Sequence, residues 1–243
     1  MKKKLKILIA GIGLVLLIPI SIHATTIKVP QDSATIQLAI DAAVDGDTVL
    51  VAEGTYVENI SFNGKDIMVA SLFITDGNHE HITSTIIDGS SPSDVNKGST
   101  VSFNSGETRA ATLIGFTIQK GRGTLTLNNK WIEGAGIIIE NSAATIKFNL
   151  IKDNENVVRS GATGGGGGGI SSIRSNPVIS NNVILNNTSG YAGGIVLNWS
   201  GGIIRNNIIF KNSSTGSWGS GGIMVWNAPE VAGNPPQIVF FCF

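Results

Sequence analysis

The segment Ile179-Ser-Asn-Asn182-Val-Ile184-Leu-Asn-Asn187 returns 25 residues later as Ile204-Arg-Asn-Asn207-Ile-Ile209-Phe-Lys-Asn212. The same pattern lies 33 residues earlier, at Ile146-Lys-Phe-Asn149-Leu-Ile151-Lys-Asp-Asn154. Another 33 residues back stands Leu113-Ile-Gly-Phe116-Thr-Ile118, with Phe116 in the position of the asparagine. Self-similarity at this period indicates a solenoid, in which each repeat packs on the next.

A second signal repeats in phase at Gly136-Ile137, Gly169-Ile170, Gly194-Ile195 and Gly222-Ile223. A unit of about 25 residues, with short β-rich runs and Asn or Gly at the corners, is typical of one coil of a parallel β-solenoid. We therefore predict an all-β chain folded as a single-stranded right-handed parallel β-helix. The longer interval before Gly169 is attributed to a flexible excursion that contains the glycine run 164–169.

Coils of a β-solenoid stack about 4.8 Å apart, so equivalent side chains lie above one another. This predicts two interior columns, Ile118, Ile151, Ile184 and Ile209, and Leu113, Ile146, Ile179 and Ile204. The stack Asn149, Asn182 and Asn207 is expected at a bend, in left-handed backbone geometry, with its amides bonded between coils. We interpret these asparagines as structural. The corner glycines are expected to adopt positive φ.

The N-terminal region predicts two elements. Residues 1–24 combine a basic start, an apolar run and a small residue at a plausible cleavage point, which is typical of a signal peptide; a membrane anchor is the alternative. The β-helix domain then covers 25–243. Asp32 or Ser33 can cap a helix over 33–44, in which Ile36, Ala39, Ile40 and Ala43 form one apolar stripe. This helix is expected to cover the first coil, and no helical period follows it.

Composition restricts the class of protein. Lys and Arg number 17 against 17 Asp and Glu, and loss of a signal peptide removes four lysines, which leaves a mildly acidic chain. This argues against a nucleic-acid partner. The single cysteine excludes a disulfide framework and a cysteine-built zinc site. We expect a secreted, extracellular or cell-surface protein that meets the membrane only through its signal peptide.

Several stretches carry a family resemblance. They are the run from Ile27-Lys-Val-Pro-Gln-Asp to Gly54-Thr-Tyr-Val-Glu-Asn-Ile60, then Ser84-Thr-Ile-Ile-Asp-Gly89, the stretch 101–106 and Gly115-Phe-Thr-Ile118. Together they resemble secreted bacterial right-handed parallel β-helix proteins of the pectin-lyase-like superfamily. The resemblance covers 27–234. It implies the fold, whereas the superfamily includes pectate lyases, pectin esterases, polygalacturonases, adhesins and repeat proteins of unassigned role.

The catalytic patterns of those enzymes are not found in the sequence. Polyuronate lyases need calcium-binding acids beside an arginine base, but Arg159, Arg174 and Arg205 have no triplet of aspartates in phase. The polygalacturonase signatures and the paired aspartates and arginine of the esterases have no match either. We therefore assign no catalytic residue and expect no cofactor. The alternative is a polyuronate lyase or esterase whose catalytic coils are missing or unrecognised.

The segment Asp76-Gly-Asn-His79-Glu-His81 holds a His-x-His pair with flanking acids. If it is extended, alternate side chains point the same way, and the pair is a weak candidate for copper or zinc. The interpretation we favour is a solvated loop between coils without a metal.

Aromatic residues suggest a binding flank. Counted from each corner isoleucine, position +3 gives Glu140, Ile173, Asn198 and Trp226, and position +4 includes Arg174 and Trp199. Trp226 is expected to point outward and Trp199 to lie near the bend. With Trp218 and Tyr191 on nearby loops and Arg174 beside them, this flank is our candidate site for extracellular polysaccharide. The alternative is that these rings cover loops or contact a partner, and Trp131 is assigned to packing.

The C-terminal segment departs from the repeat. Pro229, Val231 and Asn234 are matched to Pro177, Ile179 and Asn182, after which 235–243 no longer follow the coil pattern. We expect a truncated end that leaves the last coil uncovered and open to self-association. The sequence thus favours a non-catalytic polysaccharide-binding or adhesive protein over the enzyme alternative.

Overall fold

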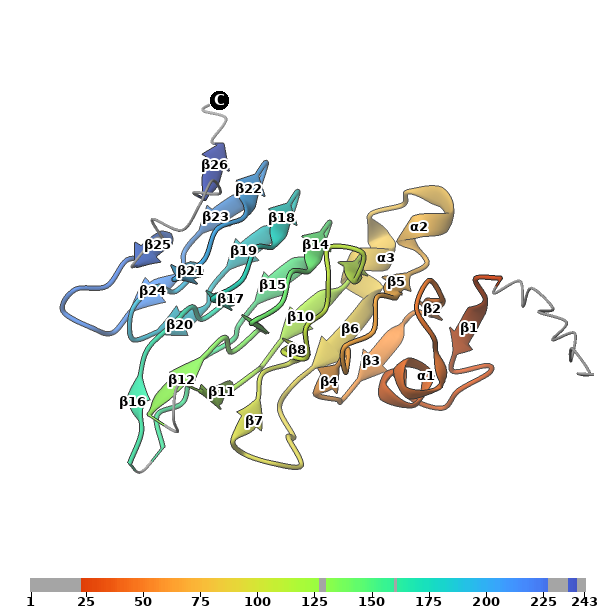
Figure 1. Ribbon diagram of the computed structural model, residues 1–243, viewed down its shortest axis with the longest axis horizontal. Helices are drawn as coiled ribbons and strands as arrows, with labels where there is room; N and C mark the ends of the chain where they lie inside the picture. Colours follow the sequence, from red (N-terminus) through yellow and green to blue (C-terminus); the bar gives the residue numbers. More distant parts are fainter. Residues whose placement is uncertain (1–22, 127–129, 160, 227–235, 240–243) are drawn as a thin grey trace, which may run out of the picture.

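The computed structural model describes residues 23–126, 130–159, 161–226 and 236–239. The chain winds into a stack of parallel coils (Figure 1), and six of the described coils add one strand to each of three sheets, A, B and C. The predicted all-β parallel β-helix is confirmed. The signal peptide prediction falls almost entirely outside the described residues. None of the helices in the described part is long and apolar enough to cross a bilayer.

Sheet A begins each coil and has eight strands. In spatial order these are β1 (Thr26–Val29), β2 (Thr48–Val51), β5 (Met68–Ser71), β9 (Thr112–Ile114), β14 (Thr145–Lys147), β18 (Val178–Ser180), β22 (Ile203–Arg205) and β26 (Gln237–Val239).

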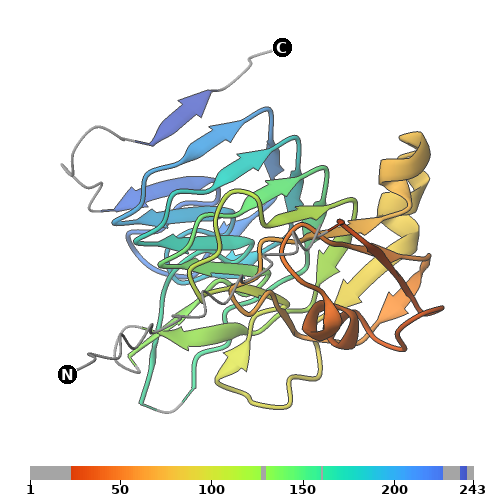
Figure 2. The ribbon, with the colours of Figure 1, turned by 45° about the vertical axis from the view of Figure 1, so that its right-hand side comes forward.

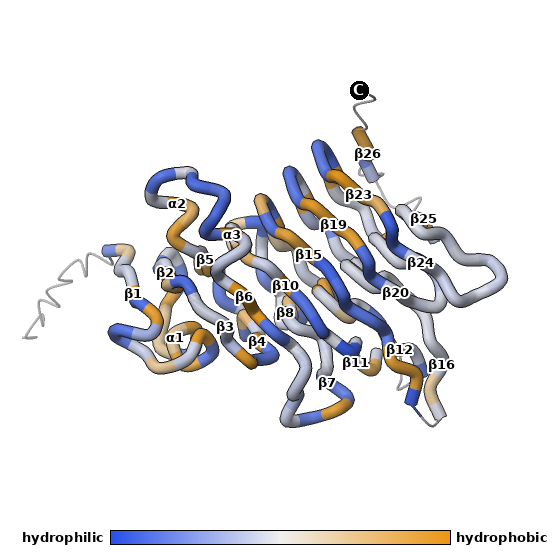
Figure 3. The backbone as a smooth tube through the Cα atoms, turned by 180° about the vertical axis from the view of Figure 1, so that it is seen from behind, coloured by the Kyte–Doolittle hydropathy of each residue, from blue (hydrophilic) through white to orange (hydrophobic). Residues whose placement is uncertain are grey.

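Sheets B and C have six strands each, and β1 and β26 are the strands of sheet A that no described strand of B or C accompanies. Sheet B consists of β3 (Gly54–Tyr56), β6 (Thr85–Asp88), β10 (Thr117–Gln119), β15 (Leu150–Lys152), β19 (Val183–Leu185) and β23 (Ile208–Phe210). Sheet C consists of β4 (Ile60–Ser61), β8 (Val101–Phe103), β13 (Ile137–Glu140), β17 (Ile170–Ile173), β21 (Ile195–Asn198) and β25 (Ile223–Trp226). Apolar residues recur side by side on β15, β19 and β23 (Figure 3).

The strand register places the predicted interior columns as expected. Ile118, Ile151, Ile184 and Ile209 are paired in sequence along sheet B, and Leu113, Ile146, Ile179 and Ile204 along sheet A. Most of these side chains are fully buried, so the apolar surface of each coil is removed from water by its neighbours. The repeated isoleucines therefore form the core.

The asparagine stack is present, but its left-handed residue was predicted wrongly. Asn149 N donates to Asn182 Oδ1 (3.0 Å), and Asn182 N donates to Asn207 Oδ1 (3.0 Å). Positive φ occurs one residue earlier, at 148, 181 and 206. The reason is that the left-handed residue turns the chain, while the following asparagine points inward and bonds the backbone of its neighbours.

Two further ladders of the same design were not predicted. Asn154, Asn187 and Asn212 bond one another at the next corner, each again following a left-handed residue. At the third corner Ser142 N donates to Ser175 Oγ, and Ser175 N donates to Ser200 Oγ (both 3.1 Å). All three corners of the coil are therefore fixed by buried or partly buried side chains that bond adjacent coils.

The corner glycines have a different role from the one predicted. None of Gly136, Gly169, Gly194 and Gly222 has positive φ. Instead the coils approach closely there: a Cβ on Gly136 would lie 2.5 Å from Gly169 O. The glycine run was also wrongly expected to be flexible, because 165–169 are buried and Gly168 N and Gly169 N donate to the next coil. Gly136, Gly169 and Gly194 need glycine because a side chain would occupy the space of the neighbouring backbone, whereas Gly222, in the last described coil, has no such close neighbour.

Helix α1 (Ile36–Ala42) covers the first coil, as predicted, although it is shorter than 33–44. Thr35 is its N-cap, in place of Asp32 or Ser33, and accepts from Leu38 N. Ile36, Ala39 and Ile40 are fully buried against the first coil, and Figure 2 shows α1 lying across that end. The helix therefore protects the apolar cross-section of the first coil from water.

Two short helices that periodicity did not predict follow β5. They are α2 (Phe73–Asp76) and α3 (Glu80–Ser84), and they project from the coil stack (Figure 1). A helix of one turn is too short to show a 3.6-residue period, which explains why the sequence pattern missed them.

The last described strand also corrects the predicted register. Ile238 of β26 pairs with Ile204 and so continues the column that contains Ile179. The sequence match had assigned this place to Val231, which, with Pro229 and Asn234, lies outside the described residues. The repeat thus resumes at Pro236, which precedes β26 as Pro177 precedes β18.

Candidate functional site

The candidate site lies on the outer face of sheet C, where a small covering sheet ends. Sheet D consists of β7 (Lys97–Gly98), β11 (Gly123–Thr126), β12 (Trp131–Glu133) and β16 (Thr163–Gly164), all from excursions between sheets B and C. The shorter pair β20 (Thr188–Ser189) and β24 (Ser213–Ser214) continues this region along later coils. Ile138 on β13 and Ser171 on β17 point outward beneath sheet D and are buried. Trp226 also points outward, on β25, two coils after β17, and is 45% exposed.

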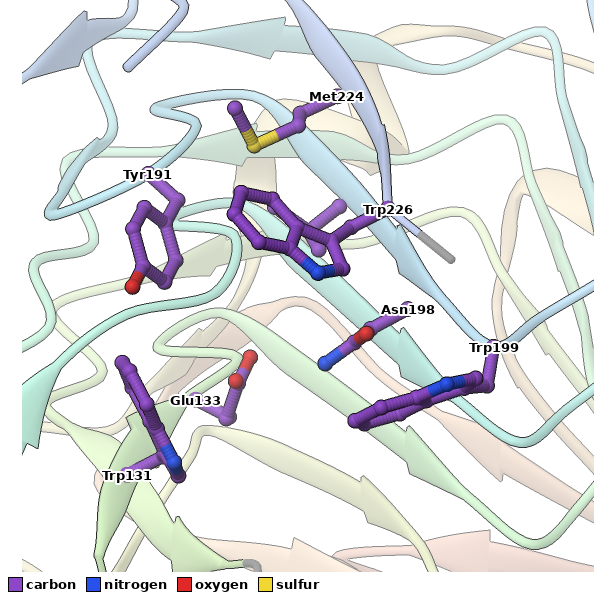
Figure 4. Close-up of a pocket in the computed structure, with 8 residues that line it drawn as sticks. Trp131, Glu133, Tyr191, Asn198, Trp199, Met224 and Trp226 are labelled. Atoms are coloured by element: carbon purple, nitrogen blue, oxygen red, sulfur yellow. The ribbon is translucent and has the colours of Figure 1, made fainter. Parts of the chain in front are cut away.

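A pocket of about 120 Å³ lies at this border. Its lining is mostly aromatic and apolar, with one carboxyl and one amide group, and consists of Trp131, Glu133, Tyr191, Val196, Asn198, Trp199, Met224 and Trp226. In Figure 4 the rings surround the hollow, and Glu133 and Asn198 lie between them. The pocket is built from three sources: strand β12 of sheet D, the turn at Tyr191, and the last two strands of sheet C.

Three rings from different coils form a continuous group. The centroids of Trp131 and Tyr191 are 5.7 Å apart, and those of Tyr191 and Trp226 are 5.6 Å apart in a stacked arrangement. Contacts at these distances are favourable for offset aromatic pairs. Gly165 passes beneath them, since a Cβ there would lie 2.8 Å from the Trp131 ring. The structure therefore brings together Tyr191, Trp199 and Trp226, as proposed from the sequence, and adds Trp131, which the sequence analysis had assigned to packing.

Glu133 is the ionisable group of the pocket that sequence reasoning missed. Ser171 Oγ accepts from Gly134 N and Gly167 N, so its one proton is free to donate to Glu133 Oε2, at 2.8 Å. Burial raises the pKa of Glu133 to about 7, although the hydrogen bond from Ser171 lowers it. The negative charge of Glu140 raises this pKa further. No ion pair among the described residues involves Glu133.

Asn198 and Trp199 complete the pocket on the side of sheet C. Asn198 stands opposite Trp226 in the register, as the predicted +3 column requires. Its Oδ1 is buried and has no hydrogen-bond partner in the described structure. Trp199 occupies the left-handed corner position with φ of 47° and is 43% exposed. A bulky residue in that conformation is uncommon, and it places the indole at the rim.

Two residues of the proposed flank lie outside the pocket. Trp218 is 85% exposed on the loop between β24 and β25. Arg174 occupies the corner one coil before Trp199, where Nη2 pairs with Glu140 Oε1 (2.8 Å) and Nε donates to Asn141 Oδ1 (2.9 Å). The guanidinium is therefore engaged with the adjacent coil.

The two histidines do not form an extended His-x-His pair. His79 precedes α3 and packs edge-on against Phe73, whereas His81 lies within the helix. Both ring nitrogens of His81 face carboxylates, Asp76 Oδ2 at 3.2 Å and Glu53 Oε1 at 2.8 Å. These hydrogen bonds, first to Asp76 and then to Glu53, raise the pKa of His81. In the described residues no cluster of three or more His, Cys, Asp or Glu side chains is arranged to hold a metal.

Comparison with known proteins adds no assignment: no family model matches the chain, and no curated protein matches it significantly. The parallel β-helix is thus the level of classification that the structure supports.

Proposed function

We propose that this chain is a non-catalytic, exported β-helix protein that binds extracellular polysaccharide through the aromatic pocket. Export rests on the signal-peptide pattern of residues 1–24. Membership of the pectin-lyase-like superfamily is part of the same proposal and rests on the sequence resemblance together with the parallel β-helix.

The observation that carries the proposal is the group formed by Trp131, Tyr191 and Trp226. Its rings come from separate coils, contact one another and border an open pocket with an amide and a carboxyl group. Partly exposed aromatic rings with nearby polar groups offer a flat apolar surface to a sugar ring and hydrogen-bonding atoms to its hydroxyls. Asn198 Oδ1 in particular is free to accept from a ligand hydroxyl.

The test is retardation of the protein in native gels that contain different polysaccharides. Trp226→Ala removes a ring from the middle of the pocket wall, and we expect it to abolish most of the retardation that the wild type shows. Trp218→Ala is the matched control, because that indole is exposed but does not line the pocket. Equal retardation of wild type and Trp226→Ala would contradict the proposed site.

A second candidate function is adhesion through self-association. Within the described residues, β23 and β25 are the last strands of sheets B and C. Ile209 and Ile223 at this edge are only partly buried, whereas Ile184 and Ile195 in the preceding coil are fully buried. Apolar side chains beside unpaired strand edges favour pairing with another chain.

Sedimentation velocity at increasing protein concentration tests this second candidate. We expect the wild type to associate and Ile223→Lys, which places a charge in the apolar edge, to remain monomeric. Leu38→Lys serves as the control because Leu38 is 55% exposed on α1, at the opposite end of the coil stack. A wild type that stays monomeric over the whole range would exclude this function.

A further inference from the structure

We propose that the aromatic pocket binds a substituted ammonium group, such as an alkylated amine carried by the glycan, with Glu133 as its counter-ion. The inference deepens the proposed function, because it names the chemical group that the same pocket selects. It rests on the ring arrangement, on an unpaired buried carboxyl group and on the absence of basic residues from the lining.

The rings provide the first argument. Trp131, Tyr191, Trp199 and Trp226 surround one small hollow (Figure 4). The face of an aromatic ring carries negative electrostatic potential, and indole attracts a cation more strongly than the other aromatic side chains do. Several such rings around one space form the type of cage that binds quaternary ammonium groups. Three of the four rings here are indoles.

Glu133 provides the second argument. The residue is 2% exposed and its carboxyl group lies among the pocket residues, yet no described cation pairs with it. Desolvation of a carboxylate costs several kcal/mol unless a partner compensates. The nearby cation Arg174 is bound to Glu140 at 2.8 Å. A positively charged ligand would supply the compensation that the described residues do not.

The lining also indicates which ligands are disfavoured. Among the described residues it contains no Lys, Arg or His, so an anionic sugar such as a uronate would meet a carboxyl group and no positive charge. The pocket is therefore unfavourable for the acidic sugars that polyuronate-degrading enzymes bind. The remaining ligands are neutral or cationic, and the unpaired carboxyl group favours the cationic ones.

The size of the hollow is consistent with a small substituent. Its volume of about 120 Å³ is somewhat smaller than the roughly 150 Å³ of a cavity that accepts benzene. A compact alkylammonium group therefore fits inside, while the polymer that carries it remains at the open side, near exposed Trp199 and Trp226.

The test compares choline with its uncharged isostere, 3,3-dimethylbutan-1-ol, in tryptophan-fluorescence titrations of the full chain at about pH 8. We expect the wild type to bind choline at least tenfold more tightly than the isostere. In Glu133→Gln this preference should fall several-fold, while affinity for the isostere is unchanged. Trp226→Phe, which retains a ring with a weaker cation interaction, should also reduce the preference.

Affinity for choline is expected to fall below about pH 7, because protonation of Glu133 removes the counter-ion. Ionisable groups around it are Glu140, which Arg174 neutralises in part, and Tyr191 in the pocket wall. The loss with falling pH should be absent in Glu133→Gln. Equal affinity of the wild type for choline and the isostere would overturn this inference.

The two proposals fail in distinguishable ways. Retardation by neutral polysaccharides together with equal binding of choline and the isostere would retain polysaccharide binding and overturn the ammonium site. Selective choline binding without retardation by any polysaccharide, including one that carries amino groups, would overturn the polysaccharide proposal and support the cation site.

Discussion

The carboxyl group of Glu133 has measurable consequences for stability. Its pKa is about 7 in the folded protein and about 4.5 in an unfolded chain, so the folded state binds the proton more tightly. The free energy of unfolding therefore falls as pH rises from about 4.5 to about 7, and the full shift corresponds to about 3 kcal/mol. We expect urea denaturation of the wild type to show this loss between about pH 4.5 and about pH 8.

Glu133→Gln provides the control for this pH dependence. The amide cannot ionise, while every other titrating group is retained, so the difference between the two proteins isolates Glu133. We expect the variant to lose about 3 kcal/mol less than the wild type over the same pH range. Parallel stability curves for the two proteins would show that the carboxyl group is not perturbed as described.

Asn182 illustrates the energetic role of the corner ladders. Its amide donates to Ile146 O (2.9 Å) and to Asn207 Oδ1 (3.0 Å), and its Oδ1 accepts from Asn149 N (3.0 Å). Asn182→Ala leaves buried backbone groups of adjacent coils unpaired. We expect a loss of about 2–4 kcal/mol in chemical denaturation.

Asn207→Ala is the matched variant for this ladder, because Asn207 is only partly buried and solvent can replace its lost hydrogen bonds. We expect its cost to be about half that of Asn182→Ala or less. An equal or larger cost for Asn207→Ala would mean that burial does not set the strength of the ladder.

Individual residues were predicted well where they belong to the repeat. The interior isoleucines and the asparagine stack follow from the alignment of repeats because equivalent positions must stack. Trp131 and Glu133 lie on an excursion that occurs once, so no periodic signal marks them. Alternation indicates only that they share a face of β12; that this face closes over Tyr191 and Trp226 depends on how sheet D folds back on sheet C.

At the scale of elements, the corner glycines permit close stacking of the coils. Gly136→Ala would place its Cβ 2.5 Å from Gly169 O and 3.1 Å from Ile151 Cγ2. Neither neighbour can move without displacing a strand, so we expect a loss of about 1–3 kcal/mol, measured by thermal or chemical unfolding.

Gly222 occupies the same corner in the last described coil of sheet C, and an added Cβ would meet nothing closer than Ser220 Oγ at 3.9 Å. Gly222→Ala is therefore expected to be nearly neutral. A similar loss from both substitutions would indicate a requirement for backbone freedom at the corner, as the sequence had suggested, and would contradict the close-approach explanation.

Elements with a regular period were predicted, and irregular ones were not. The helix predicted over 33–44, and observed over 36–42, was identified from its apolar stripe, whereas α2 and α3 are too short to show one. The β-rich run 112–118 is divided into β9 and β10 because Gly115 turns the chain with φ of 87°. The corners of the coil thus interrupt runs that appear continuous in sequence.

For the whole molecule, stacking of coils joins residues that are far apart in the chain. Trp131 and Trp226 contribute to one pocket because three coils bring their strands to the same face (Figures 1 and 4). The sequence was sufficient to predict the solenoid, the outward direction of Trp226 and the bend at Trp199. It was insufficient to predict the pocket, since pockets of a solenoid form between its irregular excursions.

The central claim is that three of the four tryptophans of the chain form one binding site and the fourth, Trp218, does not. The most direct measurement is the ¹⁵N–¹H spectrum of the indole groups during titration with a soluble fragment of a polysaccharide that retards the protein in native gels. We predict that the signals of Trp131, Trp199 and Trp226 shift together with one saturation curve, while that of Trp218 stays in place. A shift confined to Trp218, or no shift in any indole at saturation, would contradict the account.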